Sequence, residues 1–345
     1  MSDPPTVPLA ARTAILDWYA ERGRPLAFRR TTDPYAILVS EAMAQQTQAA
    51  RAADHWERWM ERFPTITALA AARPADVLRA WQGLGYDRRA LALRRAACLI
   101  VERHGGRVPS SVVELEALPG VGPYTARAVA ALAFGRRVGA VDVNVRRVLG
   151  RIVAGGGAEL LSGAAVQAIA DAAVPSDRPG GWTHAVMDVG AALCRPRTPR
   201  CGACPARPWC RYAAEVLESR SDRALPVPDR ARPTTRRARA TAAGPSAARA
   251  TAAPAAAGPS PAAARPSPAR PASARPAAFA TTNRWLRGRI LDRLRAAPDE
   301  AWVELDGPIG VHDLARVHAA AHFMSTDGLL ELDLTAGFRA RLPLA

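Results

Sequence analysis

The sequence predicts an all-α region over residues 1–222, a disordered linker over residues 223–280 and a small α+β module over residues 281–345. Three observations support this division. Apolar residues recur at helical spacing through the first region, where strand alternation is hard to find. Alanine is abundant and aromatic residues make up only 6% of the chain, which favours helices. The composition changes abruptly near residue 223 and again near residue 281.

Capping signals place several helices of the first region. Asp33 and Pro34 supply an N-cap and a first-turn proline for a helix that continues through "AILVSEAMA". Pro74 begins another short helix, and Ser111 with Glu114 forms the pattern of a capping box. We expect these helices to build the core of the region.

The linker and the C-terminal module differ sharply in composition. The stretch "GPSPAAARPSPARPASARP" cannot bury enough apolar surface to fold, and its prolines keep it extended. After it, "NRWLRGRILDRLRAA", with Asn283 as a candidate N-cap, and "VHDLARVHAAAHFM" predict two helices. "GLLELDLTAGFRARLPL" predicts two short strands around a Thr-Ala-Gly turn. This order is winged-helix-like, and the module either binds DNA or only packs. His318 and His322 lie four residues apart on a helix and could be metal ligands, but solvated or core histidines are favoured.

Charge and chain ends limit the classes of function. The formal net charge is +16, which favours a polyanionic partner, although the basic linker contributes part of it. No signal peptide or long apolar run is present, so we expect a cytoplasmic, nucleoid-associated protein without a membrane partner. The sequence contains no lysine, so no lysine amine can form a Schiff base.

Four of the five cysteines lie in "CRPRTPRCGACPARPWC", with gaps of six, two and five residues. Zinc sites usually present two Cys-x-x-Cys pairs, whereas here there is one, Cys201 and Cys204, flanked by Cys194 and Cys210. The irons of a [4Fe–4S] cluster need four thiolates from four directions. A compact loop with these gaps can supply them, and zinc remains the alternative; the match of this spacing to a known iron–sulfur pattern, which belongs to the resemblance given below, favours the cluster. Cys98, in "LRRAACLIV", is expected to be a core thiol.

A glycine-rich hairpin occurs in "LPGVGPYTARAV". Gly120 and Gly122 let backbone N–H groups approach a phosphate, and Pro123 begins a helix whose positive dipole end points the same way. The alternative is a plain helical turn. The run favours a helix–hairpin–helix, which clamps a DNA backbone without reading its sequence.

Two carboxylates are candidate catalytic groups. Glu41 lies in the apolar helix "ILVSEAMAQQTQ", either at its surface or desolvated with a raised pKa suited to donating a proton. Asp142, in "AVDVNVRRV", stands where an N-cap is expected, and capping alone would explain it.

Taken together and in this order, these motifs resemble those of the adenine DNA glycosylases (MutY type) of the endonuclease III, or helix–hairpin–helix, superfamily. The resemblance covers residues 12–212 and includes "SEAMAQQT", "GLGYDRRA" and the spacing of the four cysteines. It implies that residues 1–222 form a glycosylase domain of two helical subdomains. The loop at 194–210 would hold a [4Fe–4S] cluster through Cys194, Cys201, Cys204 and Cys210. That loop would present four arginines to DNA phosphates: Arg195, Arg197, Arg200 and Arg207.

The resemblance also implies residue roles. Glu41 would protonate N7 of a flipped adenine, and Asp142 would stabilise or trap the sugar cation. Tyr124, which stands where lyases of the superfamily carry a lysine nucleophile, and Asn144 would orient Asp142 and the water. The DNA contacts implied are Arg29 in the base pocket, Gln46 and Tyr86 inside the opened duplex, and Gly120 and Gly122 on the backbone.

The implied function is a monomeric, monofunctional glycosylase that excises adenine mispaired with 8-oxoguanine or guanine in double-stranded DNA. The alternatives are a thymine or other mismatch glycosylase of the superfamily and a non-enzymatic iron–sulfur DNA-binding protein. The chain departs from the family pattern because the C-terminal module is too short for the usual Nudix-like domain, as in the shorter forms of the family. It also departs at four positions: Phe28, Ala44, Asp87 and His184.

Overall fold

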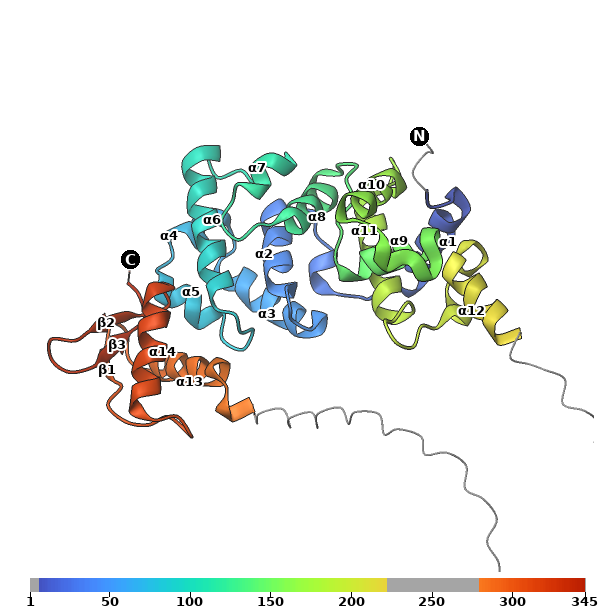
Figure 1. Ribbon diagram of the computed structural model, residues 1–345. Helices are drawn as coiled ribbons and strands as arrows, with labels where there is room; N and C mark the ends of the chain where they lie inside the picture. The colour runs from blue at the N-terminus through green and yellow to red at the C-terminus, as the bar shows by residue number, and fades with distance from the viewer. Residues whose placement is uncertain (1–5, 222–278, 345) are drawn as a thin grey trace, which may run out of the picture. The chain divides into compact units, whose positions relative to one another are not determined.

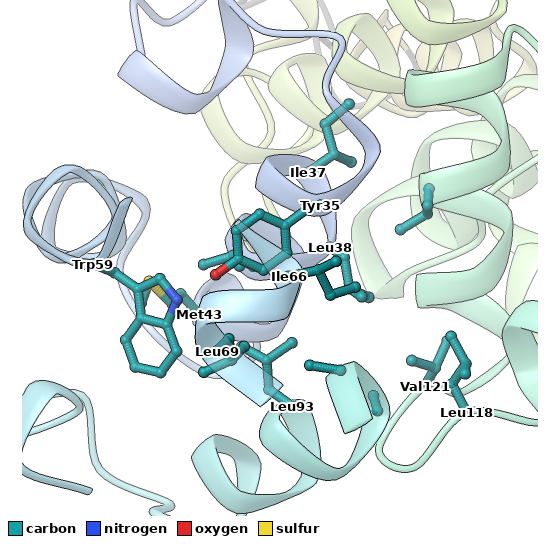
Figure 2. Packing of buried hydrophobic residues seen from close by; sticks show 14 of the residues in the cluster. Tyr35, Ile37, Leu38, Met43, Trp59, Ile66, Leu69, Leu93, Leu118 and Val121 are labelled. Atoms are coloured by element: carbon teal, nitrogen blue, oxygen red, sulfur yellow. The ribbon is translucent and has the colours of Figure 1, made fainter. Parts of the chain in front are cut away.

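The computed structural model describes residues 6–221 and 279–344, so most of the predicted linker lies outside the described residues. A first helical subdomain surrounds a core in which Leu38, Met43, Trp59 and Leu69 are almost completely buried (Figure 2). Its helices are α2 (Pro34–Ala44), α3 (Ala49–Arg62), α4 (Ile66–Ala71), α5 (Pro74–Ala80), α6 (Arg88–His104), α7 (Val112–Glu116) and α8 (Pro123–Phe134).

A second subdomain has its own core, in which Ile15, Leu149, Ile169 and Trp182 pack together. The N-terminal helix lies here beside later helices rather than beside its neighbours in sequence (Figure 1). The helices are α1 (Leu9–Arg22), α9 (Val143–Ala154), α10 (Gly163–Ala173), α11 (Pro179–Ala192) and α12 (Arg211–Ser221). Short 3₁₀ turns cover Ala27–Arg29, Gly155–Leu160, Cys201–Ala203 and Arg207–Trp209.

The predicted capping signals form as expected. The Asp33 carboxylate accepts a hydrogen bond from the N–H of Tyr35 at 3.0 Å, and Pro34 is the first residue of α2. Ser111 Oγ accepts from the N–H of Glu114 at 3.4 Å and begins α7. These local contacts begin α2, which carries Glu41, and α7, the helix before the glycine hairpin.

The C-terminal module contains the predicted helices and hairpin and one further strand. Its elements are a 3₁₀ turn (Phe279–Thr281), α13 (Asn283–Ala296), β1 (Val303–Glu304), α14 (Leu314–Thr326), β2 (Glu331–Asp333) and β3 (Arg339–Arg341). The sheet is antiparallel with the order β1-β3-β2, and Ala340 pairs with Val303 on one side and Leu332 on the other. The prediction that Asn283 caps α13 is wrong by one residue: Thr282 Oγ1 accepts from the N–H of Trp285 at 3.2 Å.

A third core joins this module to the first subdomain within one compact unit. Leu78 of α5 and Leu91 of α6 pack in the same cluster as Leu286 and Ile290 of α13. The N–H of Ala75 donates to the carbonyl of Pro343 at 3.0 Å. The module therefore contacts α5 and α6.

The two histidines of α14 take part in packing. The His318 ring stacks on Phe338 at 3.6 Å between centroids, and its Nε2 lies 2.9 Å from the carbonyl oxygen of Leu305. His322 meets the same phenyl ring edge-on. Across the described ranges, no helix is long and apolar enough to cross a membrane.

Candidate active site

Glu41 is buried on α2, with 7% of its surface exposed. Burial raises the pKa of its carboxyl group from 4.5 to about 7, and nearby Asp142 adds to the rise. A hydrogen bond from Tyr124 and the charge of Arg29 act in the opposite direction. At neutral pH this carboxyl group therefore carries a proton in a large share of molecules, which is the state a general acid requires.

Tyr124 lies on α8, the second helix of the hairpin motif, and faces Glu41. Burial, together with the Glu41 and Asp142 carboxylates, raises the pKa of the phenol well above 10. The hydroxyl therefore remains protonated and can act only as a neutral hydrogen-bonding group at physiological pH. Its oxygen also lies 3.8 Å from the sulfur of Met187 on α11.

Asp142 is the N-cap of α9, and its orientation is fixed by several contacts. Oδ1 accepts from the N–H groups of Asn144 and Val145 at 2.8 and 2.7 Å, and Oδ2 accepts from the side-chain amide of Asn144 at 2.8 Å. The capping interpretation is thus correct, and it is compatible with a catalytic role. A carboxylate at a helix N-terminus, held by three donors, is a fixed negative charge suited to a cationic sugar.

Arg147, which the sequence did not single out, extends this network toward the cysteine loop. Its guanidinium donates to Asn144 Oδ1 at 2.8 Å, to the carbonyl of Gly190 at 2.9 Å and to the carbonyl of Cys194 at 2.6 Å. One side chain therefore connects the residue that orients Asp142 with the first cysteine of the loop. Its position one turn after Asn144 on α9 was the available signal.

Arg29 lies beside a cavity of about 270 Å³ lined also by Phe28, Ser40 and His184. Both of its terminal nitrogens bond to Asp188 of α11, at 2.8 and 2.9 Å, and its Nε has no partner among the described residues. Burial alone would raise the pKa of Asp188, but hydrogen bonds from Arg29 and Arg24 outweigh it and lower the pKa. Asp188 was missed because a single aspartate in an apolar helix gives no sequence signal of its partner.

His184 also lines this cavity. Burial lowers the pKa of the His184 imidazole to about 3, and the positive charge of Arg29 contributes to this decrease. His184 is therefore neutral at physiological pH, and its ring lies 6.2 Å from that of Tyr19. The cavity therefore presents the neutral imidazole of His184 beside the cationic guanidinium of Arg29.

Gln46 and Tyr86 both have left-handed backbone conformations, with φ of 53° and 51°, and both are exposed. Such values are uncommon outside glycine and often occur at functional loops. Arg89 of α6 holds the two loops together: it donates to the carbonyls of Gln45 at 2.5 Å and Gly85 at 2.9 Å. Arg89 is a further residue that the sequence did not single out, although it lies within "GLGYDRRA".

The two hairpin glycines play different roles. Gly120 has φ of 78°, and a Cβ atom there would lie only 2.7 Å from that of Ala92. Gly122 is the N-cap of α8 with φ of −95°, and a Cβ atom there would meet nothing within 4 Å. Gly120 is thus required by the hairpin itself, whereas Gly122 leaves an open approach to the helix N-terminus.

The four loop cysteines share one side of the second core, against which Cys194, Cys204 and Cys210 pack. Burial raises the pKa of the Cys201, Cys204 and Cys210 thiols, that of Cys204 to about 11, and the neighbouring cysteines add to each rise. Four thiols are therefore gathered closely enough to influence one another. Cys98 lies elsewhere, half-buried on α6, with its Sγ 3.5 Å from the carbonyl oxygen of Ala70.

The four thiols have the number and type of donors that a [4Fe–4S] cluster requires, because each thiolate binds a different iron of the cube. Within residues 6–221 and 279–344, no three His, Cys, Asp or Glu side chains are grouped to hold one metal ion. Four mutually interacting thiols in one loop match the donor set of the cluster. The loop arginines at positions 195, 197, 200 and 207 are exposed.

Comparison with known proteins places this geometry in a family. The family model of the HhH-GPD superfamily base excision DNA repair proteins matches residues 39–159, from α2 to the turn after α9. The adenine DNA glycosylase of Mycolicibacterium smegmatis is 44% identical over 199 residues, covering 57% of this chain and 68% of the relative. That of Mycobacterium tuberculosis is 43% identical over 216 residues, covering 58% and 66%. The human one is 39% identical over 218 residues, covering 60% and 40%.

Solved structures agree on the fold. A thermostable thymine-DNA glycosylase superposes with a TM-score of 0.56 at 29% identity, covering 59% of this chain and 95% of that one. A trapped endonuclease III–DNA covalent intermediate superposes with a TM-score of 0.52 at 22% identity, covering 60% and 95%. The chain belongs to the HhH-GPD superfamily of base excision DNA repair proteins. Within it, the chain belongs to the adenine DNA glycosylase family, although it spans less than two thirds of the length of the M. tuberculosis and human relatives.

Proposed function

We propose that this protein is a monofunctional DNA glycosylase that removes adenine mispaired with 8-oxoguanine or guanine from double-stranded DNA. The observation that carries the proposal is the buried Glu41, whose pKa of about 7 suits proton donation, facing a fixed Asp142. The relatives at 39–44% identity bear the name adenine DNA glycosylase, which supports adenine as the base.

The proposed reaction begins with extrusion of the adenine, because its glycosidic bond is shielded in the stack. Gln46 and Tyr86 enter the duplex, and the base occupies the cavity beside Arg29. Glu41 donates its proton to N7, so the C1′–N9 bond breaks with its electron pair moving to a neutral leaving base. Asp142 stabilises the positive charge on the sugar, and water completes the abasic site.

Strand cleavage is not part of the proposed reaction. A lyase of this superfamily needs an amine that forms a Schiff base with the abasic sugar. The sequence has no lysine, and the hairpin helix presents the protonated phenol of Tyr124 instead. The abasic strand is therefore left intact.

A [4Fe–4S] cluster held by Cys194, Cys201, Cys204 and Cys210 is part of the proposal. When bound, it supplies structural cross-linking of the loop at residues 194–210. The chain's own residues then place the exposed loop arginines toward DNA phosphates and, through Arg147, fix Asn144. We further propose that the protein acts as a monomer in the cytoplasm, associated with the nucleoid, with DNA as its partner.

A second candidate is a thymine mismatch glycosylase, which the similarity to the thermostable thymine-DNA glycosylase favours. A purine leaves more readily once its N7 is protonated, and thymine has no N7. The buried acid Glu41 therefore favours adenine over thymine.

A single-turnover assay tests both candidates. The substrates are duplexes with adenine opposite 8-oxoguanine, guanine or thymine, and a duplex with a G·T mispair, each quenched with and without alkali. The expected result is release of adenine opposite 8-oxoguanine and guanine, with strand breaks only after alkali treatment. Release of thymine alone would support the second candidate, and binding without release of any base would contradict both.

A further inference from the structure

The C-terminal module forms one wall of a cleft of about 580 Å³ whose other wall is the loop before α6. Its lining includes five arginines and two aspartates, and three aromatic side chains: Tyr86, Phe279 and Trp285. Two strong contacts fix the walls. Arg295 of α13 forms an ion pair with Asp87 in which the side chains are only 6% and 15% exposed, and it donates to the carbonyl of Leu78 at 3.1 Å.

Most arginines of this cleft are neutralised locally. Arg295 pairs with Asp87 and Arg289 with Asp292. Arg287 and Arg88 share Asp327, at 2.7 and 3.4 Å. These pairs leave the geometry of the cleft well defined, but they reduce the charge that these four arginines can offer to a ligand.

Arg284 differs from the other four. It is exposed, and no carboxylate lies within ion-pair distance of it in the described ranges. Its guanidinium lies 4.5 Å from the centroid of the Tyr86 ring, and Nη1 lies 3.3 Å from the Tyr86 hydroxyl oxygen. The cleft arginine that has no carboxylate partner in the described ranges is thus placed directly on the side chain expected to enter the duplex.

The helix that a winged-helix protein would insert into a DNA groove is poorly suited to that task here. The exposed positions of α14 include Leu314, Ala319, His322 and Phe323, with Arg316 as the exposed cation on this helix. The side chain of Phe323 is covered on one side by Arg287 at 5.2 Å. By contrast, α13 carries five arginines in 14 residues. The basic surface of the module is therefore α13.

We propose that the cleft between α13 and the Gly83–Arg88 loop binds the sugar–phosphate backbone of the DNA duplex next to the point where Tyr86 enters it, with Arg284 as the phosphate contact. When the Tyr86 ring is inserted, the adjacent phosphate lies near the ring. Arg284 is in contact with that ring and can therefore reach the phosphate. The aromatic walls suit the neighbouring sugar and base faces. The module thus acts on DNA through α13 and the cleft. The assignment of DNA as the ligand rests on the proposed function.

Salt dependence of DNA binding tests this assignment in the full-length protein. Removing one phosphate-binding arginine reduces the magnitude of the slope of log K against log salt by about 0.9. We expect Arg284→Gln to weaken binding of a duplex whose mispaired adenine is replaced by a non-cleavable analogue several-fold, and to reduce the slope by about that amount. Arg293→Gln is the matched control, because Arg293 is an exposed arginine of the same helix that does not line the cleft. It should leave the slope unchanged.

Neutral phosphate analogues locate the contact. Methylphosphonates are introduced one at a time along both strands, and binding is measured with wild-type protein and with Arg284→Gln. At one position near the mispair, neutralisation should weaken binding by the wild type but not by the variant. Equal effects of Arg284→Gln and Arg293→Gln on the slope, or no position that distinguishes wild type from Arg284→Gln, would overturn the assignment. Both experiments measure DNA binding and not base release. If the protein failed to release adenine, the proposed function would be contradicted, but the result for Arg284 would still stand.

Discussion

Arg147 donates a hydrogen bond of 2.6 Å to the carbonyl oxygen of Cys194, while another nitrogen of the same guanidinium lies 2.8 Å from Asn144 Oδ1. Asn144 in turn holds Oδ2 of Asp142. The orientation of the proposed sugar-stabilising carboxylate therefore depends on the position of the cysteine loop.

Replacement of Arg147 by methionine should lower the single-turnover rate by about tenfold to a hundredfold, because a small displacement of a catalytic group is costly. DNA affinity should change far less. The rate and the dissociation constant are measured on the same duplex. Arg146→Met is the control, since Arg146 bonds to the carbonyl of Leu161 and not to the loop. Equal rates for the two variants would show that the Arg147 contacts are only structural.

The single-turnover rate should fall as the pH rises through about 7, because Glu41 must be protonated to donate. Glu41→Gln keeps the shape of the side chain but cannot donate a proton, so it should lose most of the rate and retain DNA binding. The pH profile of the wild type and the rate of the variant are the two measurements. A flat profile between pH 5 and 9 would exclude Glu41 as the acid.

The same carboxyl group should influence stability. Its pKa is raised in the folded state, so its stabilising contribution is complete below pH 4.5 and is lost as the pH rises through about 7. Glu41→Gln removes the cost of burying the ionised carboxylate, so at pH 8 its free energy of unfolding should exceed that of the wild type by about 3 kcal/mol at most. At pH 4.5 the two proteins should be nearly equal. Equilibrium denaturation at both pH values provides the comparison.

Asp142→Asn should abolish most of the activity while leaving the fold nearly intact. Asparagine is as good an N-cap as aspartate, so α9 keeps its first-turn hydrogen bonds. The negative charge that faces the sugar is removed. Asp142→Ala is informative beside it, because it also removes the cap and should lower stability by about 1 kcal/mol. Thermal unfolding and base release of both variants separate capping from catalysis.

The hairpin glycines should respond differently to alanine. Gly120→Ala places a methyl group against Ala92 in a left-handed backbone, so it should destabilise the fold and weaken DNA binding. Gly122→Ala meets no neighbour within the protein and should leave the melting temperature nearly unchanged. Any loss of DNA affinity in Gly122→Ala would then arise from the blocked approach to the helix N-terminus.

The predictable parts of the molecule were those specified by local sequence. The cap at Asp33, the hairpin at Gly120 and the strands around the turn after β2 follow from residue types at short spacing. Thr282 and Asn283 are both acceptable caps, so only the geometry of the chain could choose between them. At the candidate site, Glu41 and Asp142 were predicted from the motifs that carry the resemblance, and their catalytic roles stay predictions.

The ion-pair partners of charged residues that are distant in sequence were not predictable. Asp188 meets Arg29 across 159 positions of sequence, and Arg295 meets Asp87 across 208. Such pairs depend on how helices pack in space. A single sequence gives the identity of each charged residue but not which opposite charge will neutralise it.

Arg89 has a mechanical consequence for the opening of DNA. It ties the loop of Gln46 to the loop of Tyr86 through backbone carbonyls on both sides. The backbones that carry the two side chains are therefore held together by the protein itself, and the ordering entropy of the two loops is lost once, during folding. In the proposed reaction these loops meet the duplex already ordered, so the deformation falls on the nucleic acid. Base pairs weakened by a mismatch would then yield first, and the order of the loops would contribute an initial discrimination between damaged and intact DNA.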